Sequence, residues 1–171
     1  MKIEFDVGEL VPFVRPLLDA LSPSPLLRPR PQILITRPAY DTALAALASR
    51  APEFAVFLLG PRDHPAVTHV VPDTTGEGAP GSFRVGAKRL NEVLKQYAPL
   101  GLDGKGFWHS HPDGCDQLSE GDLAFVGKLF ANPNNDAREI VMPITSGGRV
   151  FPFVVRRDRP NEGLAAEFVL F

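Results

Sequence analysis

Residues 105–122 read KGFWHSHPDGCDQLSEGD and predict the end of a strand, a turn and the start of a helix. The strand is expected from Lys105 to His111, and it runs straight into the turn residues Pro-Asp-Gly at 112–114. Ser119 has the residue type of a helix N-cap, and the apolar residues 123, 126, 129 and 130 follow at helical spacing. This stretch therefore predicts a strand and a helix joined by a short loop.

The sequence on either side predicts further short elements of both kinds. Residues 54–59 are a continuous apolar run that ends at Gly60, which is typical of a strand buried on both faces. Other strands are expected at 33–36, 67–71, 139–145 and 149–155, and helices at 38–49 and 87–97. The apolar tail at 164–171 is expected to dock as a short helix or strand, and 73–82 has the composition of a flexible loop. The sum is an α/β or α+β domain, with one mixed sheet covered by two or three helices.

The domain organisation follows from length and from the distribution of proline. The chain has 171 residues, of which 44% are hydrophobic and 22% charged, so one ordinary globular domain is expected. Residues 1–31 contain six prolines among apolar stretches, and they are interpreted as an arm that drapes over the domain. The single domain is then expected to span 32–171.

Charge and hydropathy exclude several classes of partner. The net charge of −2 gives no electrostatic reason to expect nucleic acid or an anionic membrane. No segment approaches the length of a membrane span, and Met1 to Asp6 is acidic where a signal peptide would be basic and then apolar. A cytoplasmic location is expected. The single cysteine excludes an internal disulfide and any zinc site of several cysteines, so a metal would need mainly His and carboxylate ligands.

Three residues of the first stretch form a candidate metal site. His109 and His111 are two residues apart, so on a strand both imidazoles point to one face. Asp122 follows in the first turn of the next helix. Two His and one Asp with a fourth position open is the ligand pattern of a catalytic zinc. Taken alone, however, Ser119 and Asp122 also fit a helix capping box.

The joint pattern resembles the signature of the JAMM metalloproteases, also called MPN-plus or JAB. The matching residues are Trp-His-Ser-His-Pro at 108–112, six further residues, and Ser-Glu-Gly-Asp at 119–122. The family also has an upstream glutamate that opens a buried strand ending Leu-Leu-Gly, and the segment from Glu53 to Gly60 is similar to it. The resemblance covers about 33–155. Val56 departs from it, because that position is often glycine.

The resemblance implies a fold, a reaction and a set of roles. The fold is a curved sheet between helices, akin to cytidine deaminase. His109, His111 and Asp122 would hold zinc, Glu53 would be the general base and then acid, and Ser119 would donate a hydrogen bond to the oxyanion. The reaction is hydrolysis after the C-terminal glycine of a ubiquitin-like protein. Compact bacterial relatives resemble processors found with E1- and E2-like enzymes or sulfur-carrier proteins, which implies antiphage conjugation or a cofactor or siderophore pathway.

The remaining candidates have simpler interpretations. His64 is expected in a surface turn, and His69 as a structural histidine of its strand. Trp108 alternates with His109 and is expected to face the core. Ser110 also points away from the ligands, where its hydroxyl is expected to bond to the backbone and fix the ligand strand. Cys115 is interpreted as a loop thiol, with a metal or specificity role as the alternative.

Two competing functions follow from the same residues. The first is a metal-free MPN scaffold that binds a protein partner, although such scaffolds usually lose a ligand or the glutamate. The second is a thiol hydrolase that pairs Cys115 with His109 or His111, for which the sequence offers no residue to orient the histidine.

Overall fold

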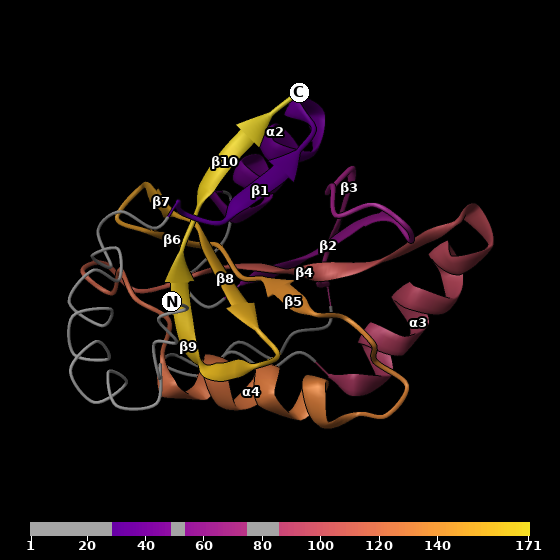
Figure 1. Ribbon diagram of the computed structural model, residues 1–171. Coiled ribbons are helices and arrows are strands. Elements are labelled where there is room, and N and C mark those ends of the chain that lie inside the picture. Colours follow the sequence, from indigo (N-terminus) through magenta and orange to yellow (C-terminus); the bar gives the residue numbers. More distant parts are fainter. Residues whose placement is uncertain (1–28, 49–53, 75–85) are drawn as a thin grey trace, which may run out of the picture.

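The computed structural model describes residues 29–48, 54–74 and 86–171 (Figure 1). Most of the proline-rich arm, Glu53 and most of the 73–82 loop lie outside the described residues. The described elements, in chain order, are β1 (Gln32–Ile35), α2 (Arg37–Ala48), β2 (Ala55–Pro61), β3 (His69–Pro72), α3 (Ala87–Tyr97), the 3-10 helix η2 (Ala98–Leu100), β4 (Leu102–Ser110), α4 (Glu120–Ala131), β5 (Glu139–Val141), β6 (Ile144–Ser146), β7 (Arg149–Phe151), β8 (Phe153–Arg156), β9 (Arg159–Ala165) and β10 (Glu167–Leu170). Among these, no helix reaches the length and hydropathy that a membrane span needs.

The strands form a mixed sheet and a smaller second one. The order in the larger sheet is β3-β2-β4-β5-β8-β9, and β6 also pairs with β4 and with β7. β2 and β4 are antiparallel, whereas β5 and β6 both run parallel to β4. The predicted mixed α+β class is confirmed. The expectation of one sheet was wrong, because β10 pairs in parallel with β1 in a separate two-stranded sheet.

The larger sheet is covered on both faces, which explains why β2 is apolar throughout. Val56 and Leu58 pack against α2 and the β1–β10 pair, while Phe57 and Leu59 face the layer of α3 and α4. Figure 1 shows these two layers, with α2, β1 and β10 on one side of the sheet and α4 on the other. Alternation along a strand thus assigns each β2 side chain to one of two cores.

The same alternation along β4 decides which way the candidate ligands point. Phe107 belongs to the α4 side of the sheet, and Trp108 to the α2 side. Trp108 is fully buried, its ring stacks on Phe168, and its Nε1 donates to Thr145 Oγ1 at 2.8 Å. Because side chains alternate between the two faces of a strand, His109 and His111 lie on the same face as Phe107, which is the face covered by α4.

Two predicted strands are each broken in two by a proline. The sequence predicts continuous strands at 139–145 and 149–155, but Pro143 separates β5 from β6, and Pro152 separates β7 from β8. Proline lacks an N–H and interrupts the ladder. β5 consequently contacts β4 at Gly106, and β6 contacts it at His109 and Ser110. A Cβ on Gly106 would lie 1.8 Å from Val141 O, so only glycine allows this close approach.

Candidate metal centre

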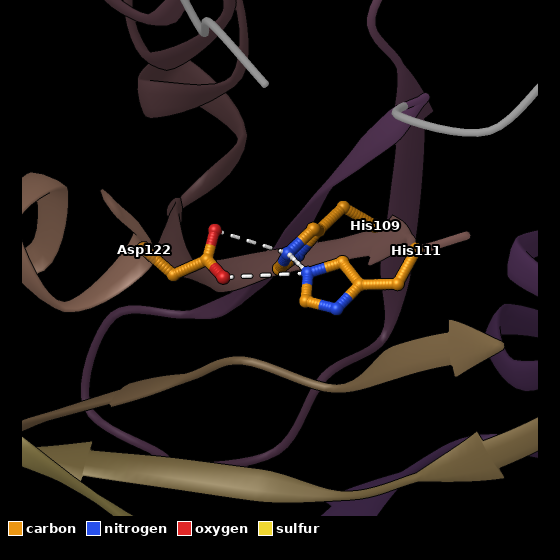
Figure 2. Close-up of side chains that lie close together, drawn as sticks. All are labelled: His109, His111 and Asp122. Carbon is orange, nitrogen blue, oxygen red and sulfur yellow. Dashed lines mark hydrogen bonds and ion pairs between the residues drawn. The ribbon is translucent and has the colours of Figure 1, made fainter. Parts of the chain in front are cut away.

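His109, His111 and Asp122 converge where β4 ends and α4 begins (Figure 2). His109 is the penultimate residue of β4, His111 follows its last residue, and Asp122 lies in the first turn of α4. All three are buried, at 0%, 9% and 5% exposure. Their ligand atoms lie within 4.8 Å of one another, which makes this group able to hold a metal ion.

The distances between the donor atoms fit a small tetrahedral cation. The two Nε2 atoms are 2.9 Å apart, His109 Nε2 is 3.2 Å from Asp122 Oδ1, and His111 Nε2 is 3.3 Å from Asp122 Oδ2. Donors about 2.0–2.1 Å from a tetrahedral zinc would be about 3.3 Å apart. Two imidazole lone pairs facing each other at such a distance need a cation or a proton between them. The donor set therefore fits a metal.

The electrostatics of the site keep its carboxylate ionised. Burial alone raises the pKa of the Asp122 carboxyl, but its polar contacts with His109 and His111 and the hydrogen bond from the Ser119 hydroxyl outweigh that effect. The pKa of Asp122 consequently lies far below its usual range. A metal ligand has to be deprotonated, so Asp122 meets that requirement at neutral pH.

A backbone carbonyl orients His111, and the sequence offered no sign of it. His111 Nδ1 lies 3.3 Å from the carbonyl oxygen of Cys115. A carbonyl only accepts, so Nδ1 carries the hydrogen and Nε2 presents its lone pair to the centre. Such a partner on the second ring nitrogen is typical of metal-binding histidines. Every residue type has a carbonyl, so no residue pattern could have indicated this contact.

Both interpretations of Ser119 and Asp122 hold at once. Ser119 is the N-cap of α4: its Oγ accepts from Asp122 N at 3.1 Å, and Asp122 Oδ2 accepts from Ser119 N at 2.7 Å. The Ser119 hydroxyl also donates to Asp122 Oδ2 at 2.7 Å. The capping box thus positions the same carboxylate that faces the two imidazoles.

Ser110 ties the end of β4 to the start of β2, as the sequence suggested. Its Oγ accepts from Phe54 N at 3.0 Å, and its own N donates to Phe54 O at 2.9 Å. The expectation that Ser110 fixes the ligand strand through the backbone is confirmed. Glu53, the residue before Phe54 and the predicted general base, lies outside the described residues, so its role stays a prediction.

The other candidates do not join this cluster within the part of the chain that the structure describes. His64 is exposed in a turn, where its Nδ1 accepts from Ala66 N at 3.2 Å. His69 is exposed on β3, and its Nδ1 lies 2.8 Å from Thr68 Oγ1. The Cys115 thiol is free and exposed. Among the described residues, the group that could hold a metal ion consists of His109, His111 and Asp122.

Several solved structures are similar in fold to this chain, although its sequence matches no family or curated protein. No family model matches the sequence, and no curated protein is significantly similar to it. A solution structure of a protein from Desulfitobacterium hafniense has a TM-score of 0.59 at 20% identity, covering 81% of this chain and 92% of that one. A second, from Salinibacter ruber, has a TM-score of 0.55 at 21% identity, with the same coverage.

A crystal structure of a JAB1/MPN domain protein from Archaeoglobus fulgidus also matches, with a TM-score of 0.46 at 19% identity over 80% of this chain and 99% of that one. The two solution structures have the fold of this chain.

Proposed function

We propose that the chain is a zinc-dependent peptidase or isopeptidase of the JAMM type, which hydrolyses the bond after the C-terminal glycine of a ubiquitin-like protein. The observation that carries the proposal is the convergence of the His109, His111 and Asp122 donor atoms in a buried group. This group lies within a sequence pattern that also includes Ser119 and Glu53. Three protein donors leave a tetrahedral ion a fourth position, as catalytic zinc sites do.

Each residue has a distinct task in this reaction. His109, His111 and Asp122 would hold the zinc, which when bound supplies Lewis-acid polarisation of the scissile carbonyl and acidifies water. Glu53 accepts a proton from the attacking water and delivers it to the leaving amine. The amine then departs with one proton gained, and the acid product keeps the oxygen of the water. Ser110 bonds to the backbone of Phe54, the residue that follows Glu53 in the sequence.

Ser119 is suited to two tasks in turn. It is exposed to solvent, whereas Asp122 is buried. Its hydroxyl donates to Asp122 Oδ2, which orients the carboxylate toward the imidazoles. When substrate is present, the same hydroxyl is placed to turn and donate to the oxyanion. The proposal therefore gives Ser119 a share in both ligand positioning and catalysis.

The proposed substrate and partners rest on the sequence resemblance. A ubiquitin-like protein, free as a precursor or joined to a target, would be the substrate, and E1- and E2-like enzymes would be the partners. The net charge of −2 gives no electrostatic support for nucleic acid or an anionic membrane as partner.

The proposal is tested by metal analysis and a cleavage assay on the purified full chain. We expect about one zinc per chain, lost in His109→Ala and retained in the exposed-histidine controls His64→Ala and His69→Ala. We expect Glu53→Gln to keep zinc and to lose cleavage of a ubiquitin-like fusion that ends in Gly-Gly.

The outcomes separate the competing functions. A wild-type protein without zinc and without cleavage would identify the metal-free scaffold. Full activity in Glu53→Gln would contradict the proposed general base. Loss of cleavage in Cys115→Ala, with zinc still bound, would favour the thiol hydrolase.

A further inference from the structure

The backbone of both histidines is held by the strand beside them. His109 N donates to Pro143 O at 3.2 Å, and His111 N donates to Thr145 O at 2.8 Å. These bonds belong to the parallel pairing of β4 with β6, in which His109 lies opposite Ile144. The two candidate ligands are therefore in register with β6.

Beyond His111, side-chain hydrogen bonds take the place of the backbone hydrogen bonds between β4 and β6. Pro112 follows His111 and has no N–H to donate. Instead, Ser146 Oγ donates to Pro112 O at 2.8 Å, and Asp113 Oδ1 accepts from Gly147 N at 3.0 Å. Ser146 is 5% exposed, so its hydroxyl has little competition from water. The turn of the β6–β7 hairpin is thereby fastened to the loop that leaves the ligand strand.

The fastened loop is the one that orients His111. Cys115 N donates to Pro112 O at 3.1 Å, which closes a tight turn, and the Cys115 carbonyl then faces His111 Nδ1 at 3.3 Å. A shift of Pro112 or Asp113 would move that carbonyl, because the turn links them directly. The carbonyl selects the tautomer with the hydrogen on Nδ1 and directs Nε2 to the centre.

We infer that Ser146 and Asp113 are positioning residues of the metal centre, which set the tautomer and direction of His111 through the Cys115 carbonyl before a metal arrives. The identity of the metal rests on the proposed function, but the contacts themselves do not. The inference extends the functional unit to the β6–β7 hairpin, which contributes no ligand among the described residues.

The first test measures zinc affinity by competition with a chromogenic chelator. We expect Ser146→Ala and Asp113→Ala each to weaken zinc binding by about tenfold, the lower end of the range for partners of metal ligands. Ser146→Thr, which keeps the hydroxyl, should restore the affinity. Asp116→Ala is the matched control. Asp116 is an exposed carboxylate of the same loop, and its side chain makes no hydrogen bond or ion pair in the described part of the chain. This variant should bind zinc as the wild type does.

The second test reads the tautomer of His111 by long-range ¹⁵N–¹H NMR in the zinc-free protein. We expect a hydrogen on Nδ1 in the wild type and in Asp116→Ala, and a mixture of tautomers in Ser146→Ala and Asp113→Ala. A wild type that binds no zinc would contradict the proposed function, and the NMR result would still decide this inference. The inference would be overturned if Ser146→Ala and Asp113→Ala melted at a lower temperature but kept the wild-type tautomer of His111 and, where the protein binds zinc, the wild-type zinc affinity. The contacts of Ser146 and Asp113 would then serve stability alone.

Discussion

The two ends of α4 are both capped by polar side chains, but the caps differ in what else they contact. At the N-terminus, Ser119 and Asp122 form a capping box, and the Asp122 carboxylate also faces two imidazoles. At the C-terminus, the Arg157 guanidinium donates to the carbonyls of Phe130, Asn135 and Ala137 and lies over the Phe130 ring. An acid at the N-terminus and a base at the C-terminus both complement the helix dipole.

The difference between the two ends shows how a helix-capping residue can also belong to the candidate metal centre. The N–H donors of Arg157 that the structure places in hydrogen bonds all go to backbone carbonyls of the chain around the helix end, so its role is structural. Asp122 has two carboxylate oxygens: Oδ2 receives the capping bonds, and Oδ1 faces His109 without any part in the cap. A carboxylate can therefore complete a capping box and still offer an oxygen to a metal. This predicts that changes at the two ends of α4 will separate metal binding from stability.

The largest effect is expected at Asp122. Asp122→Asn keeps a side-chain acceptor for Ser119 N but removes the anionic ligand. We expect zinc affinity to fall by more than about a hundredfold, beyond the range for residues that only support ligands. The zinc-free protein should also melt at a lower temperature, because the low pKa of Asp122 means that its ionised carboxylate stabilises the folded state at neutral pH. Affinity is measured by chelator competition and stability by thermal unfolding without metal.

The control for this variant is Glu120→Gln, which removes an exposed acid from the same helix turn. It should cost no more than about 0.5 kcal/mol through the helix dipole and leave zinc binding unchanged. Equal zinc affinities in Asp122→Asn and in the wild type would show that Asp122 is only a cap.

The next effect is expected at the other end of the helix. Arg157→Ala leaves three carbonyls without their charged donor and removes the contact with the Phe130 ring. We expect a loss of about 2–3 kcal/mol in the free energy of unfolding, measured by denaturant titration. Zinc affinity of the folded protein should remain that of the wild type.

Arg157→Lys should recover only part of this stability, because a lysine cannot donate in a planar fork to several carbonyls. A large drop in zinc affinity in Arg157→Ala, measured where the variant is fully folded, would mean that the two ends of α4 are coupled.

The same two ends show how far the sequence could predict this molecule. Ser119 and Asp122 were predicted as cap or ligand, because their residue types and their spacing from His111 carry that information. The role of Arg157 was not predicted, because it lies in a turn between β8 and β9 and its partners are backbone carbonyls. The contacts of Cys115 and Ser146 escaped prediction for the same reason.

Longer-range pairing was likewise beyond the reach of local patterns. The helix α3 was predicted with its observed bounds, and β2 as a buried strand, because periodicity and apolar runs are local signals. The pairing of β10 with β1 joins the two ends of the described chain, and no short pattern encodes it. The strand breaks at Pro143 and Pro152 could be read from the prolines themselves, but the apolar residues on either side favoured continuous strands.

The effect expected for Ser119→Ala is divided among stability, zinc affinity and catalysis, and this division is the informative result. Loss of the N-cap hydroxyl should lower the free energy of unfolding by about 1 kcal/mol. Zinc affinity should fall by about tenfold, because Asp122 loses one of the bonds that orient it. If the hydroxyl also donates to the oxyanion, kcat of the zinc-saturated enzyme should fall by about a hundredfold with little change in KM. A variant that loses affinity but keeps kcat under zinc saturation would restrict Ser119 to orienting the carboxylate, and the N-terminal cap of α4 would then act on catalysis only through the ligand that it holds.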